Sequence, residues 1–139
     1  MLSGLPASGK DYWVECNAAN WPMISLDAIR EDLGIAPNGP QSEVLNQARE
    51  LAREHLRMGR DFIWNSTNLS RNVRGECLRL LNGFDAHLRI VYIEVPAEQL
   101  FAQNRQRRRR MPEKIIERLF DRWEVPDCTE AHRVDYVVK

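Results

Sequence analysis

The sequence is poor in cysteine and has no long apolar run. Its 139 residues include three cysteines, an odd and widely spaced set that forms neither a disulfide framework nor a cysteine metal site. No apolar stretch approaches the roughly 20 residues that a membrane-spanning helix needs, and we expect no signal peptide ahead of the first motif. These absences predict a reducing, cytoplasmic location and no membrane partner.

Lysine is also scarce, and arginine carries most of the positive charge. Twenty Lys and Arg residues balance twenty Asp and Glu residues, so net charge selects no partner. However, 17 of the 20 basic residues are arginine, and five of these fall within residues 105–110. Guanidinium groups pair with phosphate in a forked geometry that an ammonium cannot match. The composition therefore favours phosphate recognition.

Short apolar runs alternate with helical patterns along the chain. The length suits one domain with its own core. The sequence predicts strands over residues 1–3, 23–26, 61–65, 88–95 and 134–138. It predicts helices over residues 10–19, 27–33, 42–58 and 70–81, the last of them capped by Ser70, then one from Pro96 and one from Pro112. This alternation predicts an α/β domain with a parallel sheet that helices cover on both faces. Because a buried strand usually has about five or six residues, the short first strand suggests a truncated start or a module of a longer protein.

Residues 4–10 match the P-loop pattern Gly-x-x-x-x-Gly-Lys between a strand and a helix. Glycines let backbone N–H groups converge on phosphate oxygens, and the helix N-terminus adds its positive end. Lys10 would supply a charge for the β- and γ-phosphates. We predict ATP binding at Gly4, Pro6, Ser8, Gly9, Lys10 and Asp11. The alternative is a strand-to-helix turn with a chance lysine.

Two positions depart from the usual P-loop pattern. Asp11 stands where the pattern has the Ser or Thr that binds Mg²⁺. A carboxylate is also a good Mg²⁺ ligand, so Asp11 is our candidate metal ligand; alternatively, it only caps the helix start. P-loop enzymes commonly carry a metal-organising Asp at the end of the third strand, where Asn65 and Ser66 supply no acid. We expect the two departures to be linked, because the first adds the carboxylate that the second lacks.

Asp27 follows the second predicted strand, and Arg30 comes three residues later. Ligands of open α/β sheets bind outside the carboxyl ends of the strands. Asp27 would therefore lie near the transferable phosphate and accept the proton of an attacking hydroxyl, while Arg30 binds a phosphate on the acceptor. The alternative is a solvated ion pair on a short helix. Thr67 and Asn68 either bind phosphate or a water on Mg²⁺, or form a strand-end turn and a helix cap.

Residues 105–110, here called the arginine segment, follow a helix and precede Pro112. Such a charge run is either a solvated face or a mobile basic lid that closes over nucleotide phosphates. The absence of alternating acids favours the lid, because unpaired arginines would repel one another unless a polyanion binds. Arg105 and Arg107 are the predicted contacts.

Five short motifs occur in a fixed order: Gly-Leu-Pro-Ala-Ser-Gly-Lys, Ser-Leu-Asp-Ala-Ile-Arg, Asn-Ser-Thr-Asn-Leu-Ser-Arg-x-x-Arg, Gln-Asn-Arg-x-Arg and Trp-Glu-Val-Pro-x-x-x-Glu-Ala. Together they resemble the P-loop kinases related to the bacteriophage polynucleotide kinase, often described as AAA family ATPases. The resemblance covers nearly the whole chain. It implies a P-loop NTPase three-layer sandwich with a parallel sheet and an Arg-rich lid, with residues 1–139 as a single kinase domain.

The resemblance also implies an activity. Asp27 corresponds to the general base, Arg30 to the acceptor-phosphate ligand, Lys10 to the P-loop lysine, and Arg105 or Arg107 to the lid arginines. The implied reaction is ATP- and Mg²⁺-dependent transfer of the γ-phosphate to a hydroxyl, with a polynucleotide 5′-hydroxyl as the leading acceptor. Further residues expected beside the acceptor are Thr67, Asn68 and Arg71. Two alternatives stay open: a kinase of the same fold for a nucleotide, sugar or antibiotic, and a non-catalytic ATP-binding regulatory module.

Overall fold

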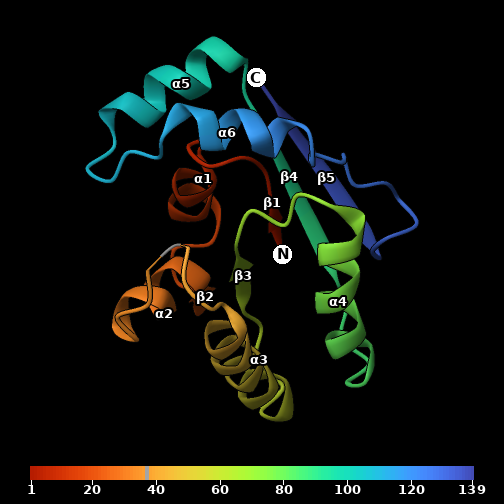
Figure 1. Cartoon of the computed structure of the whole chain (residues 1–139). Helices are drawn as coiled ribbons and strands as arrows, with labels where there is room; N and C mark the ends of the chain where they lie inside the picture. Colours follow the sequence, from red (N-terminus) through yellow and green to blue (C-terminus); the bar gives the residue numbers. More distant parts are fainter. Residues whose placement is uncertain (37) are drawn as a thin grey trace.

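The computed structural model describes residues 1–36 and 38–139, and strands alternate with helices through them (Figure 1). The strands are β1 (Leu2–Ser3), β2 (Met23–Ser25), β3 (Ile63–Asn65), β4 (Arg89–Glu94) and β5 (Arg133–Val138). The helices are α1 (Lys10–Asn17), α2 (Leu26–Asp32), α3 (Ser42–Arg57), α4 (Arg71–Asn82), α5 (Ala97–Gln106) and α6 (Glu113–Phe120). The predicted α/β class and parallel strands are confirmed.

The strands pair in parallel, but their hydrogen bonds are divided between a three-stranded and a two-stranded ladder set, so the single predicted sheet is hydrogen-bonded as two. β4 lies between β1 and β5, and β2 pairs with β3. The ladders meet just beyond the ends of β1 and β3, where the Gly4 N–H donates to the Thr67 carbonyl at 3.0 Å. β1 has only two residues, and both pair with β4. The carboxyl ends of β1 and β3 are therefore joined in front of the P-loop.

Helices cover both faces of the sheet. Ile63 belongs to a buried cluster that includes Val14 of α1. The next residue, Trp64, belongs to a cluster with Val44 of α3, against which Leu80 of α4 packs. Because successive side chains of a strand point to opposite faces, α1 covers one face while α3 and α4 cover the other. The result is the three-layer arrangement that the sequence predicts.

The carboxyl ends of the central strands are enclosed by α5 and α6, which lie together over that end of the sheet (Figure 1). Leu5, just after β1, and Val95, just after β4, share a buried cluster with Leu100 of α5 and Ile116 of α6. The last residue, Lys139, donates its backbone N–H to the Glu94 carbonyl at 3.1 Å, so the chain ends beside β4. In the described part of the chain, no helix combines the length and apolarity needed to cross a membrane.

Serine hydroxyls start the two helices that follow β2 and β3. Ser25 accepts from the Ala28 N–H at 3.3 Å, and Ser70 accepts from the Val73 N–H at 3.3 Å. Such bonds satisfy backbone donors that the first helical turn leaves free. The Ser70 cap was predicted. The Ser25 cap was not, because Ser25 is also the last residue of β2. It begins α2 immediately at the strand end and thereby places Asp27 in the first turn.

Candidate active site

The P-loop needs glycine at two positions because of its backbone conformation. Gly4 has φ of 154° and Gly9 has φ of 97°, both in the region that disfavours side chains. A Cβ at Gly4 would stand 2.5 Å from the Ile93 carbonyl oxygen, so any other residue would collide with β4. Ser8 is 2% exposed, and its hydroxyl has no hydrogen-bond partner within the described residues. A buried hydroxyl without a partner costs stability unless a ligand satisfies it.

Lys10 folds back over this loop. Its Nζ donates to the Gly4 carbonyl at 3.0 Å and to the Leu5 carbonyl at 2.8 Å. Burial lowers the pKa of Lys10 from 10.5 to about 8; Asp11 and Asp27 oppose that decrease, and Arg107 adds to it. Asp11, Asp27 and Arg107 therefore each lie close enough to Lys10 to affect its charge. They come from α1, α2 and the arginine segment, so the structure brings together four of the predicted site residues.

Asp27 stands at the carboxyl end of β2, in the first turn of α2, and its side chain is 81% exposed. Its carboxylate is ion-paired with the Arg30 guanidinium, whose Nε also donates to Gln41 Oε1 at 2.9 Å. Arg30 is thus held between α2 and the start of α3. The exposed ion pair given above as the alternative is therefore present, and the Asp27 carboxylate within it is open to solvent.

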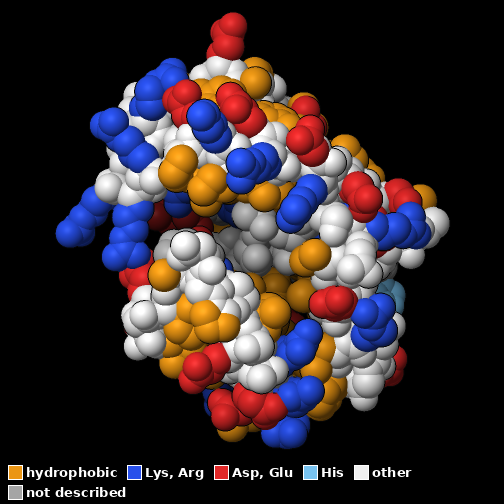
Figure 2. All heavy atoms as spheres, in the orientation of Figure 1, with side chains coloured by type: hydrophobic (Ala, Val, Ile, Leu, Met, Phe, Trp, Pro, Cys, Tyr) orange, Lys and Arg blue, Asp and Glu red, His pale blue; other side chains and the backbone are white. Residues whose placement is uncertain are grey.

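The arginine segment is a closed loop on the surface. Buried Asn104 fixes its base: the Asn104 amide donates to the Met111 carbonyl at 2.8 Å and accepts from the Met111 N–H at 3.0 Å. Lys and Arg side chains project at the left of the molecule, where the segment between α5 and α6 lies (Figure 2). Arg105 pairs with Glu113 at 3.0 Å, and Arg109 pairs with Glu31 of α2. The segment therefore spans from α6 to the helix that carries Asp27.

Sequence reasoning missed the role of Asn104. Its side chain is 2% exposed at the end of α5. It lies within the Gln-Asn-Arg-x-Arg motif, so the motif was visible, but neighbouring arginines suggested only charge. A buried amide directly before a run of exposed arginines was the available signal, because buried polar side chains need partners.

Asp11 and Asn65 face each other across the P-loop. The Asn65 Nδ2 donates to Asp11 Oδ1 at 2.8 Å, although 54 residues separate them. Within residues 1–36 and 38–139, no three His, Cys, Asp or Glu side chains gather as a metal site. Mg²⁺ is commonly bound by one or two carboxylates together with substrate phosphates. One exposed carboxylate beside a P-loop fits that mode of binding.

Thr67 and Asn68 contribute to the scaffold of the site. The Thr67 carbonyl accepts from the Gly4 N–H, and the Asn68 amide donates to the Leu2 carbonyl at 2.6 Å. Asn68 is 1% exposed and adopts a positive φ of 46°. Its buried side-chain amide is therefore already hydrogen-bonded to β1. The expectation that this amide contacts phosphate or acceptor is therefore not supported, whereas the alternative of a strand-end turn matches the geometry.

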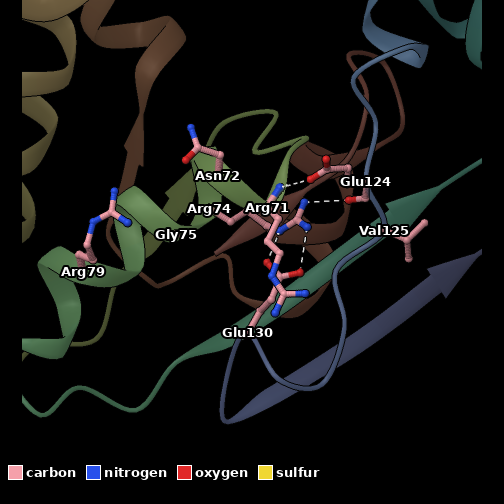
Figure 3. A pocket seen from close by; sticks show the side chains of 8 residues that line it. All are labelled: Arg71, Asn72, Arg74, Gly75, Arg79, Glu124, Val125 and Glu130. Carbon is pink, nitrogen blue, oxygen red and sulfur yellow. Dashed lines mark hydrogen bonds and ion pairs between the residues drawn. The ribbon is translucent and has the colours of Figure 1, made fainter.

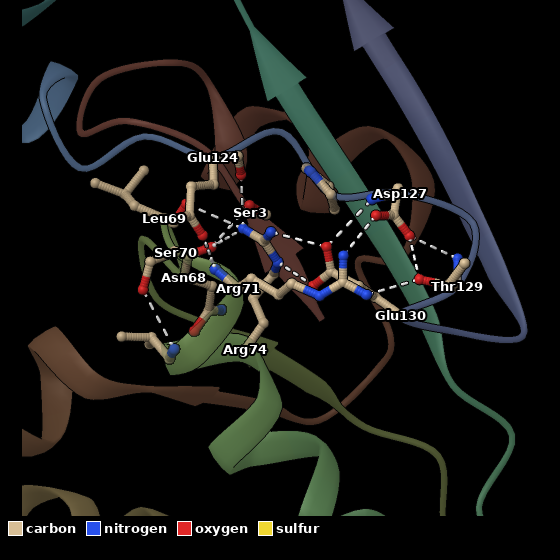
Figure 4. A network of polar contacts seen from close by, with 12 residues as sticks. Ser3, Asn68, Leu69, Ser70, Arg71, Arg74, Glu124, Asp127, Thr129 and Glu130 are labelled. Atoms are coloured by element: carbon tan, nitrogen blue, oxygen red, sulfur yellow. Dashed lines mark hydrogen bonds and ion pairs between the residues drawn. The ribbon is translucent and has the colours of Figure 1, made fainter.

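The Arg71 side chain contacts the loop that precedes β5. Its guanidinium donates to Asp127 at 2.7 Å and to the Thr129 hydroxyl at 2.8 Å (Figure 4). Its backbone N–H donates to the Glu124 carboxylate at 2.5 Å. The structure therefore does not join Arg71 to the other acceptor candidates, because nearby acids already pair with its charge.

Arg74 and Glu130 form a buried ion pair that the sequence did not reveal. The Arg74 side chain is 0% exposed, and its Nε and Nη2 donate to the two Glu130 oxygens at 2.7 and 2.9 Å (Figure 4). Its Nη1 donates to the carbonyls of Asn68, Leu69 and Glu124 at 2.8–3.1 Å. The pKa of Glu130 is lowered although burial opposes this, because Arg74 stabilises its carboxylate. The pair thus ties the end of β3 to residues 124–130.

A shallow hollow of about 650 Å³ opens beside this network (Figure 3). It is lined by Arg71, Asn72, Arg74, Gly75, Arg79, Glu124, Val125 and Glu130. None of the P-loop residues lines it. We assign the candidate site to the P-loop, where convergent charges and a glycine-rich turn supply chemistry, and regard the hollow as a surface of the structural network.

Parallel strands, a glycine-rich turn after β1 and a lysine at the start of α1 together define the P-loop kinase type of fold. The chain belongs to the AAA domain family, which it matches over residues 1–126. This match does not confirm that the chain belongs to the polynucleotide kinase-like group that its motifs resemble.

Relatives of known description agree with this fold. The chain is 22% identical over 155 residues to the L-seryl-tRNA(Sec) kinase of Methanococcus maripaludis, in an alignment covering 98% of this chain and 60% of that relative. The chain therefore spans less than two thirds of that protein. A candidate kinase from Chloroflexus aurantiacus j-10-fl superposes with a TM-score of 0.76 at 16% identity, covering 99% of this chain and 82% of the other. A gluconokinase from Sinorhizobium meliloti 1021 superposes with a TM-score of 0.65 at 18% identity, covering 99% of this chain and 79% of the other.

Proposed function

We propose that the chain is an ATP-dependent phosphotransferase that moves the γ-phosphate to a hydroxyl. The observation that carries this proposal is that Asp27 and Arg107 both lie close enough to the P-loop lysine, Lys10, to affect its charge. A binding module needs the lysine and the loop but has no use for an exposed carboxylate at the same place. Kinase relatives of the same fold add support.

The proposed roles follow from charge and position. An acceptor hydroxyl attacks the γ-phosphorus, its proton passes to the Asp27 carboxylate, and the bond to the bridging oxygen breaks to release ADP. Lys10 and Arg107 balance the negative charge on the phosphates, with Arg105 as a second candidate from the arginine segment. Arg30 orients Asp27 and can bind a phosphate on the acceptor.

Asp11 is the proposed protein ligand for the Mg²⁺ that accompanies ATP. It is exposed on α1 directly after Lys10, and carboxylate oxygens suit this ion. When bound, Mg²⁺ neutralises charge on the β- and γ-phosphates. The rest of the proposed nucleotide contact is made by the loop itself, through Gly4, Pro6, Ser8 and Gly9.

The leading acceptor is a hydroxyl carried by a nucleic acid, such as a polynucleotide 5′-hydroxyl. Its support is the arginine segment, where Arg107, Arg108 and Arg110 are exposed and have no ion-pair partner within the described residues. A relative named for a tRNA-linked substrate points the same way. The second candidate is a small polyol, because a structural neighbour is a gluconokinase.

Single-turnover transfer from γ-labelled ATP tests this function. The acceptor panel holds RNA and DNA oligonucleotides with 5′-hydroxyls, nucleosides, gluconate and related sugars, each with wild type and Asp27→Asn. Labelled oligonucleotide as the product would support the leading acceptor, and labelled sugar would support the second. If ATP binds but no acceptor on the panel is labelled, a regulatory nucleotide-binding module becomes the better description.

A further inference from the structure

Asp11 and Asn65 make a direct side-chain contact between the first turn of α1 and the end of β3. Asn65 is 8% exposed, and its Nδ2 donates to Asp11 Oδ1 at 2.8 Å. The same Nδ2 lies 3.5 Å from the Met23 sulfur. The buried amide is thus held in place, while the carboxylate it contacts is exposed. That hydrogen bond uses one oxygen of Asp11 and leaves Oδ2 for a cation.

The charge at these two positions departs from the usual P-loop pattern. A P-loop normally follows its lysine with a Ser or Thr hydroxyl on Mg²⁺, and an Asp from a neighbouring strand supplies the negative charge. Here the P-loop position has the carboxylate and the strand position has the neutral amide. The summed charge of the pair is −1 in both arrangements. Only its location differs.

We propose that Asp11 and Asn65 are an exchanged metal pair. Asp11 carries the carboxylate that holds the Mg²⁺ of the bound nucleotide, and Asn65 is a positioning residue that orients this carboxylate through Oδ1. This inference rests on the proposed function only in requiring a nucleotide at the P-loop. It specifies which residue supplies the charge, and it gives Asn65 a role distinct from packing.

Electrostatics explains why the exchange would affect binding. A carboxylate beside the phosphates repels them, and this repulsion is stronger near a protein surface than in bulk water. A divalent cation between the two anions reverses the sign of the interaction. Nucleotide affinity should therefore depend more strongly on Mg²⁺ when Asp11 is present than when a hydroxyl replaces it.

Calorimetric titration with ADP tests the pair, with and without Mg²⁺, and needs no catalysis. The variants are Asp11→Ser, Asn65→Asp, the double variant, and Asp11→Asn as a second way to remove the charge. Glu15→Ser is the matched control, because it removes an exposed acid from the same helix one turn further along. We expect Mg²⁺ to strengthen ADP binding to wild type and Glu15→Ser by about tenfold or more.

The single and double variants should behave differently. In Asp11→Ser and Asp11→Asn, we expect the Mg²⁺ enhancement to fall to about threefold or less. Asn65→Asp places two carboxylates in contact, so ADP affinity without Mg²⁺ should fall. The double variant Asp11→Ser/Asn65→Asp restores one hydroxyl and one acid and should recover the wild-type enhancement.

Two results would overturn the inference, and they are distinguishable. If all variants bind ADP with the same Mg²⁺ enhancement as wild type, Asp11 only caps α1, and the proposed kinase function is untouched. If wild type binds no ADP under either condition, the proposed function fails together with the metal pair.

Discussion

Nucleotide affinity should fall steeply with pH once Lys10 loses its proton. Burial lowers the pKa of Lys10 from 10.5 to about 8, with Arg107 adding to the decrease and the two nearby aspartates opposing it. A phosphate that contacts Nζ requires the ammonium form. The apparent Kd therefore equals the Kd at low pH multiplied by 1 + 10^(pH − pKa), where the pKa is that of Lys10 in the unliganded chain. This gives a loss of about tenfold near pH 9 and about a hundredfold near pH 10.

The same pKa predicts the opposite trend for the stability of the unliganded chain. An unfolded lysine keeps its proton up to its ordinary pKa of 10.5, whereas folded Lys10 keeps it only up to about 8. Between these values the unfolded state binds more protons, so the free energy of unfolding rises with pH. Below about pH 8 the penalty of a buried ammonium is present in full, at about 3 kcal/mol.

Calorimetry with ADP and Mg²⁺ between about pH 7 and pH 10 measures the first trend in wild type, Lys10→Arg and Lys10→Ala. Arginine keeps its charge over this range, so Lys10→Arg should lack the decline, and Lys10→Ala should bind weakly throughout. Urea unfolding of wild type against Lys10→Met measures the second trend. A wild-type affinity that stays flat to about pH 10, or an equal decline in Lys10→Arg, would refute the reasoning.

Two further variants probe the structural parts of the site. Arg74→Met leaves the Glu130 carboxylate buried without its partner and should cost about 3–5 kcal/mol in urea unfolding, whereas Arg71→Met removes an exposed contact and should cost far less; equal losses would contradict the buried pair. Asn104→Ala removes both bonds that close the arginine segment and should lower γ-phosphate transfer about tenfold with little change in ADP affinity. Glu113→Gln, which breaks only an exposed pair, is its control, and unchanged transfer in Asn104→Ala would mean that the arginines need no fixed loop.

Local signals in the sequence were sufficient for the helices and for the P-loop. The Gly4-to-Lys10 spacing, the Ser70 cap and the periodicity of α3 each depend on residues within a few positions of one another, so one segment contains the whole signal. The strands were also predictable, because β4 contains the apolar run 90–93, and their parallel pairing followed from the alternation of strands with helices. Element ends differ from the predictions by at most two residues.

The contacts that assemble the site were not predictable, because they join distant segments. Arg74 and Glu130 lie 56 residues apart, and nothing near either residue indicates the other. Arg71 was expected beside the acceptor, yet its guanidinium pairs with Asp127 in the loop before β5. Asn68 looked available for phosphate, yet its amide is buried against β1. In each case, hydrogen bonds or ion pairs with residues far away in the sequence determine where the side chain lies.

The Asp27→Asn variant tests phosphoryl transfer at this P-loop most directly. Mg²⁺·ATP affinity and single-turnover transfer to the acceptor identified by the panel are measured on the same preparation, with Asp32→Asn as a control that removes an acid from the same helix. Loss of a general base should lower transfer by about a hundredfold or more while ATP affinity stays within about threefold. Transfer by Asp27→Asn at a rate near that of Asp32→Asn and wild type would contradict the assignment of Asp27 as the base.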